Sequence, residues 1–481
     1  MTGALSLLLP AALAAYFLYQ AIRRPIFLLG IPFMQVMARS VFFWELRPFR
    51  MPVALGTNGV ILMWMALAWI WCLLCSRMET GAREPLSGRR PPRLLPEEYL
   101  LVALAVLVLG KILWGGIVSA GSQTVLGQFA PWGLLLVGYF FVRGAVRRSS
   151  SQDVAALLLA VAAATGIASV LFILHQGLGI SIYSTRAYQI ISFGGQKLTR
   201  TYWIMSPFLL VSLAVGATLI VGGASGRQKI AALVLAGVSL VAVLISYTRN
   251  YVLAAAAVIA VLVLLRWLKE RRLDVLVRRS LPIAAVLACV AVVLVVAMPA
   301  STAYLLQRMG SVTNASKVTS DENLLVRQSD LIGVGTVVYG HYPFLGAPFG
   351  VEDDFSRRVA DWIPDSTWTG VLYWTGFVGL AIVGAMFVLF GFRALSLFLR
   401  TSGSTEFLAA VLVSGIVALF INSLTGWSFL DESVYAMGFW LFAFVTGETL
   451  KDMESDAAIG REEIAVIDEP AGSGKISGAL R

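Results

Sequence analysis

Arginines in the connections between apolar segments are the residues of this sequence best suited to chemistry. A guanidinium is always charged, and its planar fork of donors matches the oxygen atoms of a phosphate group. The charge pattern described below assigns one set of arginines to the outer side of a membrane, where basic residues are normally scarce. This set consists of Arg186, Arg200, Arg249, Arg308, Arg327, Arg357 and Arg358. It indicates an external site for a phosphate or pyrophosphate group.

Arg249 is the most constrained of these residues. It lies in the Ser-Tyr-Thr-Arg-Asn turn of residues 246–250, between two apolar segments. The shortness of this turn keeps the guanidinium at the membrane surface, where the phosphate of a lipid would lie. By contrast, we interpret Arg308 and the pair Arg357 and Arg358 as solvated charges of a long loop.

Arg327 lies in a predicted amphipathic helix. Thr319 and Glu322 have capping-box spacing, and an apolar face follows, made of Leu324, Leu325, Leu331 and Ile332. The periodicity leaves two orientations open, with Arg327 facing the bundle or facing solvent. The prolines and glycines of residues 341–350 then predict a rigid turn. His341 could serve there as a base or as a simple turn residue, and we favour the turn residue.

Carboxylates and aromatic rings cluster before the next apolar segment. The acids are Glu352, Asp353, Asp354, Asp361 and Asp365, and the rings are Phe355, Trp362, Trp368, Tyr373 and Trp374. Acids accept hydrogen bonds from hydroxyl groups and rings cover the apolar faces of pyranoses, so the cluster is typical of a sugar site. The alternative is an aromatic belt at the membrane interface.

The composition indicates the elements that position these residues. The 481 residues are 58% hydrophobic and 13% charged, with a mean hydropathy of +0.81. Charges this sparse and apolar runs this long exclude a soluble enzyme, a disordered chain and a single-span receptor. The fold class expected is all-α, a polytopic transmembrane helical bundle. The net charge of +10 fits basic residues retained on the cytoplasmic side, so we expect no nucleic-acid partner.

Twelve segments are predicted to span the membrane, at about 3–20, 51–76, 99–119, 126–142, 153–175, 202–222, 229–247, 251–266, 280–298, 368–390, 406–424 and 434–449. The stretch 25–44 is either a thirteenth span or an interfacial helix, and this choice decides the side of the N-terminus. Basic residues gather on every second connection, which leaves 176–201, 248–251 and 299–367 outside. The expected parts are an N-terminal bundle (1–298), a partly helical periplasmic loop (299–367), C-terminal helices (368–450) and a flexible tail (451–481).

Ionisable and thiol side chains inside the predicted spans are few. Lys111 lies midway along one span, and an intramembrane charge usually marks function, although a lysine can also reach an interface along its stem. Cys72, Cys75 and Cys289 lie in apolar runs without His or acid at metal spacing. We therefore expect no metal site and no disulfide framework.

Three motifs resemble the O-antigen ligase and polymerase family, which are membrane glycosyltransferases with lipid-linked sugar donors. The turn Thr248-Arg249 resembles the family's Ser-Arg turn. Arg327 followed by His341-Tyr-Pro-Phe-Leu-Gly346 resembles its arginine helix and Pro-Leu-Leu-Gly turn. Residues 365–379 resemble the ligase signature of His, then Asn, Ser or Gln, nine residues, Gly, two residues, and Gly, Thr or Tyr. Ser366, Gly376 and Gly379 are in register, while Asp365 replaces the His.

The resemblance, which covers residues 190–395, implies inverting transfer of a glycan from polyprenyl pyrophosphate to a sugar hydroxyl, without a metal or other cofactor. Arg249 and Arg327 would bind the donor phosphates and Asp365 would be the catalytic base. The implied substrate-binding residues are Arg200, Arg186, His341, Asp361, Trp368 and Tyr373. Because Asp365 stands where a ligase has His, a polymerase is favoured over a lipid A core ligase.

Two further alternatives from other classes stay open, a flippase or exporter of lipid-linked sugars and a scaffolding subunit of an envelope assembly. The expected location is the bacterial inner membrane, with the site facing the periplasm. The expected partners are the lipid-linked donor, a glycan or lipid-linked glycan acceptor, membrane lipids and a chain-length regulator protein.

Overall fold

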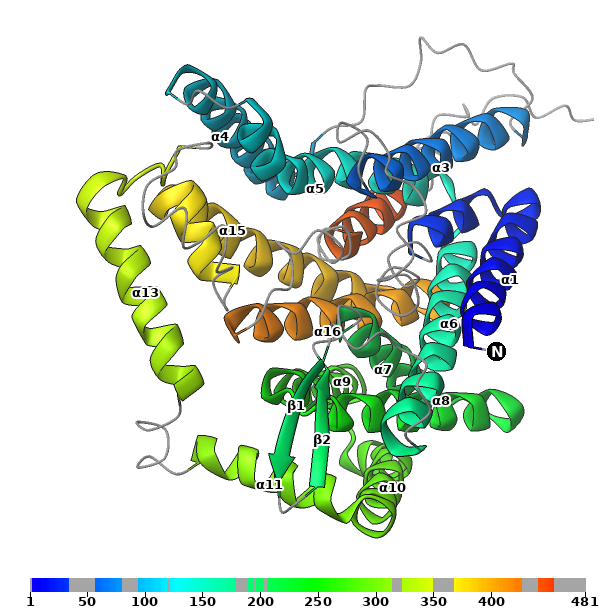
Figure 1. Cartoon of the computed structure of the whole chain (residues 1–481). Helices are drawn as coiled ribbons and strands as arrows, with labels where there is room; N and C mark the ends of the chain where they lie inside the picture. Colours follow the sequence, from blue (N-terminus) through cyan, green and yellow to red (C-terminus); the bar gives the residue numbers. More distant parts are fainter. Residues whose placement is uncertain are drawn as a thin grey trace, which may run out of the picture.

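The part of the chain that the structure describes folds almost entirely into α-helices (Figure 1). The structure, a computed structural model, describes residues 2–33, 57–79, 94–118, 122–178, 188–193, 196–201, 206–313, 322–348, 367–425 and 440–453. Its elements in chain order are α1 (Thr2–Arg23), the 3-10 helix η1 (Pro25–Leu29), α3 (Thr57–Glu79), α4 (Pro96–Val118), α5 (Ser122–Arg148), α6 (Ser151–Leu178), β1 (Tyr188–Phe193), β2 (Gln196–Thr201), α7 (Ser206–Val221), α8 (Gly226–Ile245), α9 (Arg249–Glu270), α10 (Leu273–Ala297), α11 (Pro299–Thr313), α13 (Glu322–His341), α15 (Thr367–Arg400), α16 (Gly403–Thr425) and a last helix over 440–453.

Eight helices of the described residues are long and apolar enough to cross a membrane. They are Gly59–Met78, Pro96–Gly115, Ser151–Leu174, Gly226–Ile245, Arg249–Glu270, Val277–Ala297, Thr367–Arg400 and Gly403–Leu424. Each predicted span coincides with a helix over most of its length. The structure thus confirms a helical, membrane-embedded bundle, while the expected number of 12 or 13 spans stays a prediction.

The expected all-α class omitted one element, a two-stranded antiparallel hairpin in the connection 176–201. Strands β1 and β2 pair from Tyr188 opposite Thr201 to Phe193 opposite Gln196. The sequence between them is Gly-Gly, a pair typical of two-residue hairpin turns, and β1 is rich in β-branched and aromatic residues. These signals mark the hairpin in a connection that hydropathy alone describes only as a loop.

Helix α7 lies at the centre of the bundle. It is apolar all round, which is the pattern of a helix buried on every side. Small residues on such a helix permit close packing in membranes, and at Gly216 an added Cβ would lie 3.0 Å from the carbonyl oxygen of Ala232 in α8. The residues of α7 in the core are Phe208, Leu209, Leu210, Val211, Leu213, Ala214, Val215, Ala217, Ile220 and Val221.

A single core joins the N-terminal bundle to the C-terminal helices. It contains side chains from Phe17 in α1 to Val445 in the last helix. That helix extends to residue 453, and Lys451 donates to the carbonyl oxygen of Ser149 at 2.9 Å. Lys451 therefore belongs to the packed bundle, and the remainder of the expected tail, from 454, lies outside the described residues.

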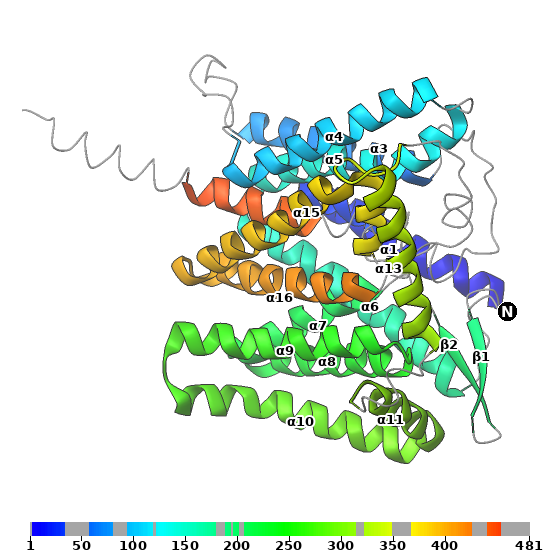
Figure 2. The ribbon, with the colours of Figure 1, turned by 90° about the vertical axis from the view of Figure 1, so that its left-hand side faces the viewer.

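The ion pairs between described residues gather at one end of the bundle. Glu98 pairs with Arg143, with 2.6 Å between Oε1 and Nε, and Arg266 pairs with Glu406 at 2.7 Å. These arginines belong to the connections that the charge pattern assigns to the cytoplasm. Figure 2 shows the α9–α10 and α15–α16 connections at this end, and α11, α13 and the hairpin at the other. We call these the ion-pair end and the hairpin end.

Helices α1 and α3 both finish at the ion-pair end. The indole Nε1 of Trp71 in α3 donates to the Ala21 carbonyl at 3.0 Å, and Arg24 pairs with Asp153 at 3.2 Å. After Arg24 the chain enters the core, where Ile26, Phe27 and Phe33 are buried, and the Phe33 ring lies 4.2 Å from that of Phe208 near the start of α7. Residues 34–44 lie outside the described residues, so the choice between a span and an interfacial helix for 25–44 stays open.

We predict that Arg143→Met destabilises the fold by about 3–5 kcal/mol, because it leaves the fully buried Glu98 carboxylate without its cation. Thermal unfolding in detergent measures the effect. The double variant Glu98→Gln/Arg143→Met should recover much of the loss. Arg272→Ala is the control, since its ion pair with Asp274 is exposed. Equal stability of Arg143→Met and the native chain would contradict the prediction.

Candidate functional site

Helix α15 is broken at Gly376, where φ is 64° and ψ is −165°. The turn of residues 342–347 packs against this break and replaces hydrogen bonds that the helix loses. The Ala347 amide donates to the Tyr373 carbonyl at 2.8 Å, and the Phe377 and Val378 amides donate to the carbonyls of residues 343 and 344 at 3.1 and 3.2 Å. Irregular backbone at membrane depth is tolerated when protein groups satisfy it in this way.

Two glycines make this contact possible. Gly346 has a φ of 73°, and a Cβ there would lie 2.5 Å from the Gly376 nitrogen. A Cβ on Gly376 would in turn lie 2.4 Å from the Phe344 carbonyl oxygen. Both the left-handed backbone and the close approach of two main chains require glycine.

Lys111 binds the same turn from α4. Its side chain is 2% exposed, and the ammonium group donates to the carbonyl oxygen of Gly346 and, at 3.0 Å, to that of Ala347. It also lies 5.2 Å from the ring centroid of Trp114. The intramembrane charge that the sequence singles out is thus satisfied by main-chain carbonyls. Its role in the structure is to hold the turn.

The turn follows α13 directly in the chain and packs against α15. Val334 and Val338 of α13 form a small cluster with Ala347, Leu372 and Tyr373. Tyr373, expected to bind substrate, is buried, so in this structure its ring packs within the cluster.

His341 and Trp368 lie near this connection, His341 as the last residue of α13 and Trp368 in the first turn of α15. His341 is exposed, and its ring lies 6.1 Å from that of Tyr342. The turn expected over residues 341–350 is confirmed at residues 343–345, but His341, expected to be a turn residue, is helical.

The Arg249 turn lies at the hairpin end between α8 and α9. Tyr247 has a left-handed backbone with φ of 53°, and its ring lies 5.4 Å from that of Tyr304 in α11. The Thr248 hydroxyl donates to the Ser246 carbonyl at 3.2 Å, and it makes no hydrogen bond that caps α9. Arg249 is the first residue of α9, so its guanidinium adds to the positive end of the helix dipole.

Helix α16 makes side-chain hydrogen bonds both to the Arg249 turn and to the start of α15. The side-chain amide of Asn250 donates to Asn422 Oδ1 at 2.6 Å, and the Trp368 indole donates to Ser423 Oγ at 2.8 Å. Asn422 and Ser423 are consecutive residues near the end of α16. The Thr248-Arg249 turn and the start of α15, which belongs to the signature segment 365–379, are far apart in the sequence. Both are held by neighbouring residues of α16.

The structure leaves several expected site residues untested. Arg186, Asp361 and Asp365 lie outside the described residues, as do Ser366 and the Arg357–Arg358 pair. Arg200 lies in β2 opposite Gln189 and Arg327 lies within α13, but the description of both residues stops at the backbone. The expected helix around Arg327 is confirmed, and its orientation stays open.

The polar residues that join the elements of the site are not among those predicted from the sequence. Asn250, Asn422 and Ser423 are all buried. A detectable signal was the Asn-Ser pair at the end of an otherwise apolar span, because polar groups placed there need a partner.

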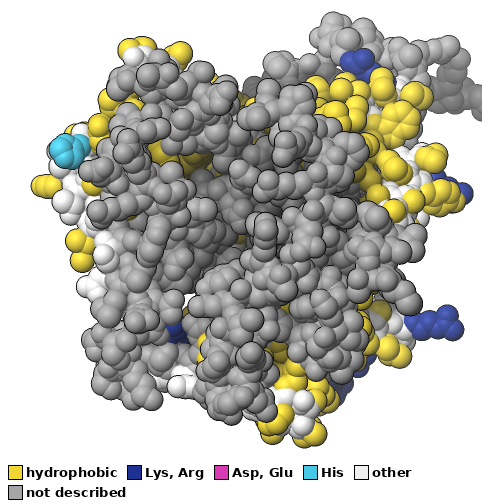
Figure 3. Space-filling view, viewed as in Figure 1, with side chains coloured by type: hydrophobic (Ala, Val, Ile, Leu, Met, Phe, Trp, Pro, Cys, Tyr) yellow, Lys and Arg dark blue, Asp and Glu magenta, His cyan; other side chains and the backbone are white. Residues whose placement is uncertain are grey.

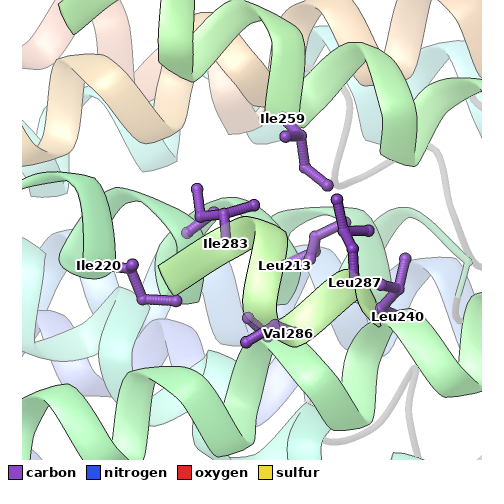
Figure 4. Close-up of a pocket in the computed structure, with 9 residues that line it drawn as sticks. Leu213, Ile220, Leu240, Ile259, Ile283, Val286 and Leu287 are labelled. Carbon is purple, nitrogen blue, oxygen red and sulfur yellow. The ribbon is translucent and has the colours of Figure 1, made fainter. Parts of the chain in front are cut away.

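The pocket of Figure 4 lies between α7, α8, α9 and α10 and has an entirely aliphatic lining. Its residues are Leu213, Ala217, Ile220, Ala236, Leu240, Ile259, Ile283, Val286 and Leu287. Such a lining offers nothing to a charged or sugar group. Among the described residues, no group of three or more His, Cys, Asp or Glu side chains is placed to hold a metal ion.

The fold defines the chain as a membrane-embedded helical protein with a broken helix and an arginine turn at one end. Comparison with protein-family models found no match, and comparison with curated proteins found none. The family resemblance therefore rests on the three motifs, two of which, the Thr-Arg turn and the signature segment, meet through α16.

We predict that Gly346→Ala and Gly376→Ala each destabilise the protein by more than about 1 kcal/mol, because both positions combine positive φ with a backbone contact. Gly384→Ala in the same α15 is the matched control, since its Cβ would meet no atom within 4 Å. Thermal unfolding in detergent distinguishes them. Equal effects at all three positions would show that the break does not depend on glycine.

We predict that Lys111→Met destabilises the protein by about 1–3 kcal/mol, because buried carbonyl acceptors lose their donor. Lys111→Arg should recover part of the loss. Hydrogen exchange at the Ala347 and Phe377 amides gives the local readout, and both should exchange faster in Lys111→Met. Unchanged exchange there would rule out the lysine as the group that holds the turn.

Proposed function

We propose that this protein is a bacterial surface-polysaccharide polymerase. It transfers a glycan from a polyprenyl-pyrophosphate donor to a sugar hydroxyl, with inversion and without a metal. The observation that supports this most is the meeting of the Arg249 turn with the first turn of α15 through Asn422 and Ser423. In this proposal Arg249 binds the donor phosphate, and the acids and rings before and within the first turn of α15 bind the sugar.

The donor pyrophosphate develops negative charge as it leaves. The start of α9 and the guanidinium of Arg249 both present positive potential there, and positioned charge of this kind lowers the barrier. Arg327 and Arg200 contribute further positive charge, in line with the family resemblance. In this proposal the guanidinium groups stabilise the leaving pyrophosphate in place of a metal ion.

The acceptor hydroxyl needs a group that removes its proton. Asp365, two residues before Thr367 at the start of α15, takes this role. Trp368 presents an aromatic surface for a sugar, with its ring braced 5.6 Å from Phe420. Arg186, His341 and Asp361 complete the substrate contacts, and Tyr373 supports them from the core.

The protein lies in the bacterial inner membrane, and its site faces the periplasm. Its partners are the lipid-linked donor, a glycan acceptor and a chain-length regulator protein. An O-antigen ligase is the alternative within the family and differs only in its acceptor, lipid A core. A flippase or exporter is less supported, because the intramembrane ammonium of Lys111 is engaged by carbonyls instead of being available for ion coupling.

Release of polyprenyl pyrophosphate from a lipid-linked repeat unit tests the proposal, with product length read on a gel. Native protein should give laddered glycans. Arg249→Ala should reduce the rate by about 10²-fold or more, and Asp365→Ala should abolish it. Arg272→Ala is the matched control, because this exposed arginine lies at the ion-pair end.

Three outcomes distinguish the alternatives. Turnover only after addition of lipid A core would identify a ligase. Transport of the donor without release of polyprenyl pyrophosphate would identify a flippase. If Arg249→Ala gave the same laddered glycans at the native rate, the protein would be a polymerase but Arg249 would have no role in its site.

A further inference from the structure

Helix α13 and the turn after it expose a row of large apolar side chains. Leu331, Ile332 and Tyr339 are 53%, 60% and 78% exposed, and Phe344 and Leu345 are 71% and 47% exposed. In Figure 3, hydrophobic side chains show along the edge of the molecule where Figure 1 places α13. A surface of this kind needs an apolar environment.

The bundle fixes the rotation of α13 about its axis. Val334 and Val338 are buried against Leu372 and Tyr373 of α15. Successive residues of an α-helix are about 100° apart around its axis. On this basis the exposed Leu331, Ile332 and Tyr339 share one arc about 100° wide, next to the side that the two valines occupy. The exposed Gln328 also lies within this arc. The next arc holds Ser329, Thr336, Gly340 and Glu322. The helix is amphipathic, and its exposed apolar arc lies between the bundle and the polar arc.

The turn after α13 lies at membrane depth. It is bound by Lys111, which precedes the last residue of α4, Val118, by seven positions, or about 10 Å of helix. It also contacts α15 at Gly376, nine residues after Thr367. The exposed rings and aliphatic groups of this turn are therefore level with the apolar part of the spanning helices.

Helix α13 itself runs across the hairpin end of the bundle, not along the spanning helices (Figure 2). An amphipathic helix that lies in the plane of the membrane surface has this orientation and this distribution of side chains. We propose that α13 is an interfacial helix whose Leu331, Ile332 and Tyr339, with Phe344 and Leu345 of the turn, insert among the acyl chains of the lipid. This inference goes beyond the polymerase and does not depend on it.

Spin labels at single cysteines test the inference without an activity assay. The three native cysteines, at positions 72, 75 and 289, are first replaced by alanine, and the protein is placed in nanodiscs of phosphatidylcholine and phosphatidylglycerol. Labels at Leu331, Ile332 and Tyr339 are compared with labels at Ser329 and Thr336, on the polar arc of the same helix. The ratio of collisions with oxygen to collisions with a water-soluble nickel complex should be severalfold higher at the first three positions.

A second measurement keeps the native cysteines. Benzoylphenylalanine at Ile332 should crosslink to phospholipid on illumination, and at Thr336 it should crosslink much less, as read by mass spectrometry. Equal nickel accessibility at positions 332 and 336 would place the helix in water and overturn the inference. Crosslinks from position 332 to a second copy or another protein would overturn it too, since the occupant would then be a protein surface.

Discussion

The contact between the turn of residues 342–347 and the break in α15 is the constraint on which the hairpin end depends. Main-chain amides and carbonyls at membrane depth have no water to bind, so an irregular segment survives only where protein groups satisfy it. Here the Ala347 amide donates to a carbonyl of α15, and the Lys111 ammonium donates to the carbonyls of Gly346 and Ala347. Three segments, distant in the sequence, are held at one point.

The positions of α13 and of the first part of α15 follow from this contact. The valines of α13 pack on Leu372 and Tyr373 because the turn brings the two helices together. Trp368, at the start of α15, is then fixed by Ser423 on α16. The intramembrane lysine, which sequence rules mark as a functional group, thus acts on the candidate site through the backbone that it positions.

Among the described residues, charged side chains stand at helix starts at both ends of the bundle. At the ion-pair end, acids at the starts of helices pair with arginines, as Glu98 does with Arg143 and Glu406 with Arg266. At the hairpin end, Arg249 begins α9 and therefore reinforces the positive potential of a helix start. The positive potential of this helix start, with the guanidinium of Arg249, is the physical basis for proposing that a phosphate group binds at the hairpin end.

Features that depend on local composition could be predicted from the amino-acid sequence. Apolar runs predicted the helices, because burial in a membrane requires them, and the prolines and glycines after His341 predicted a turn. Even the missed hairpin had a local signal in its Gly-Gly pair. What these elements contact could be learned only from the folded chain. The carbonyl that Lys111 binds is 235 residues away, and the partner of Asn250 is 172 residues away. Periodicity within one segment carries no information on such distant partners, because packing of the whole bundle selects them.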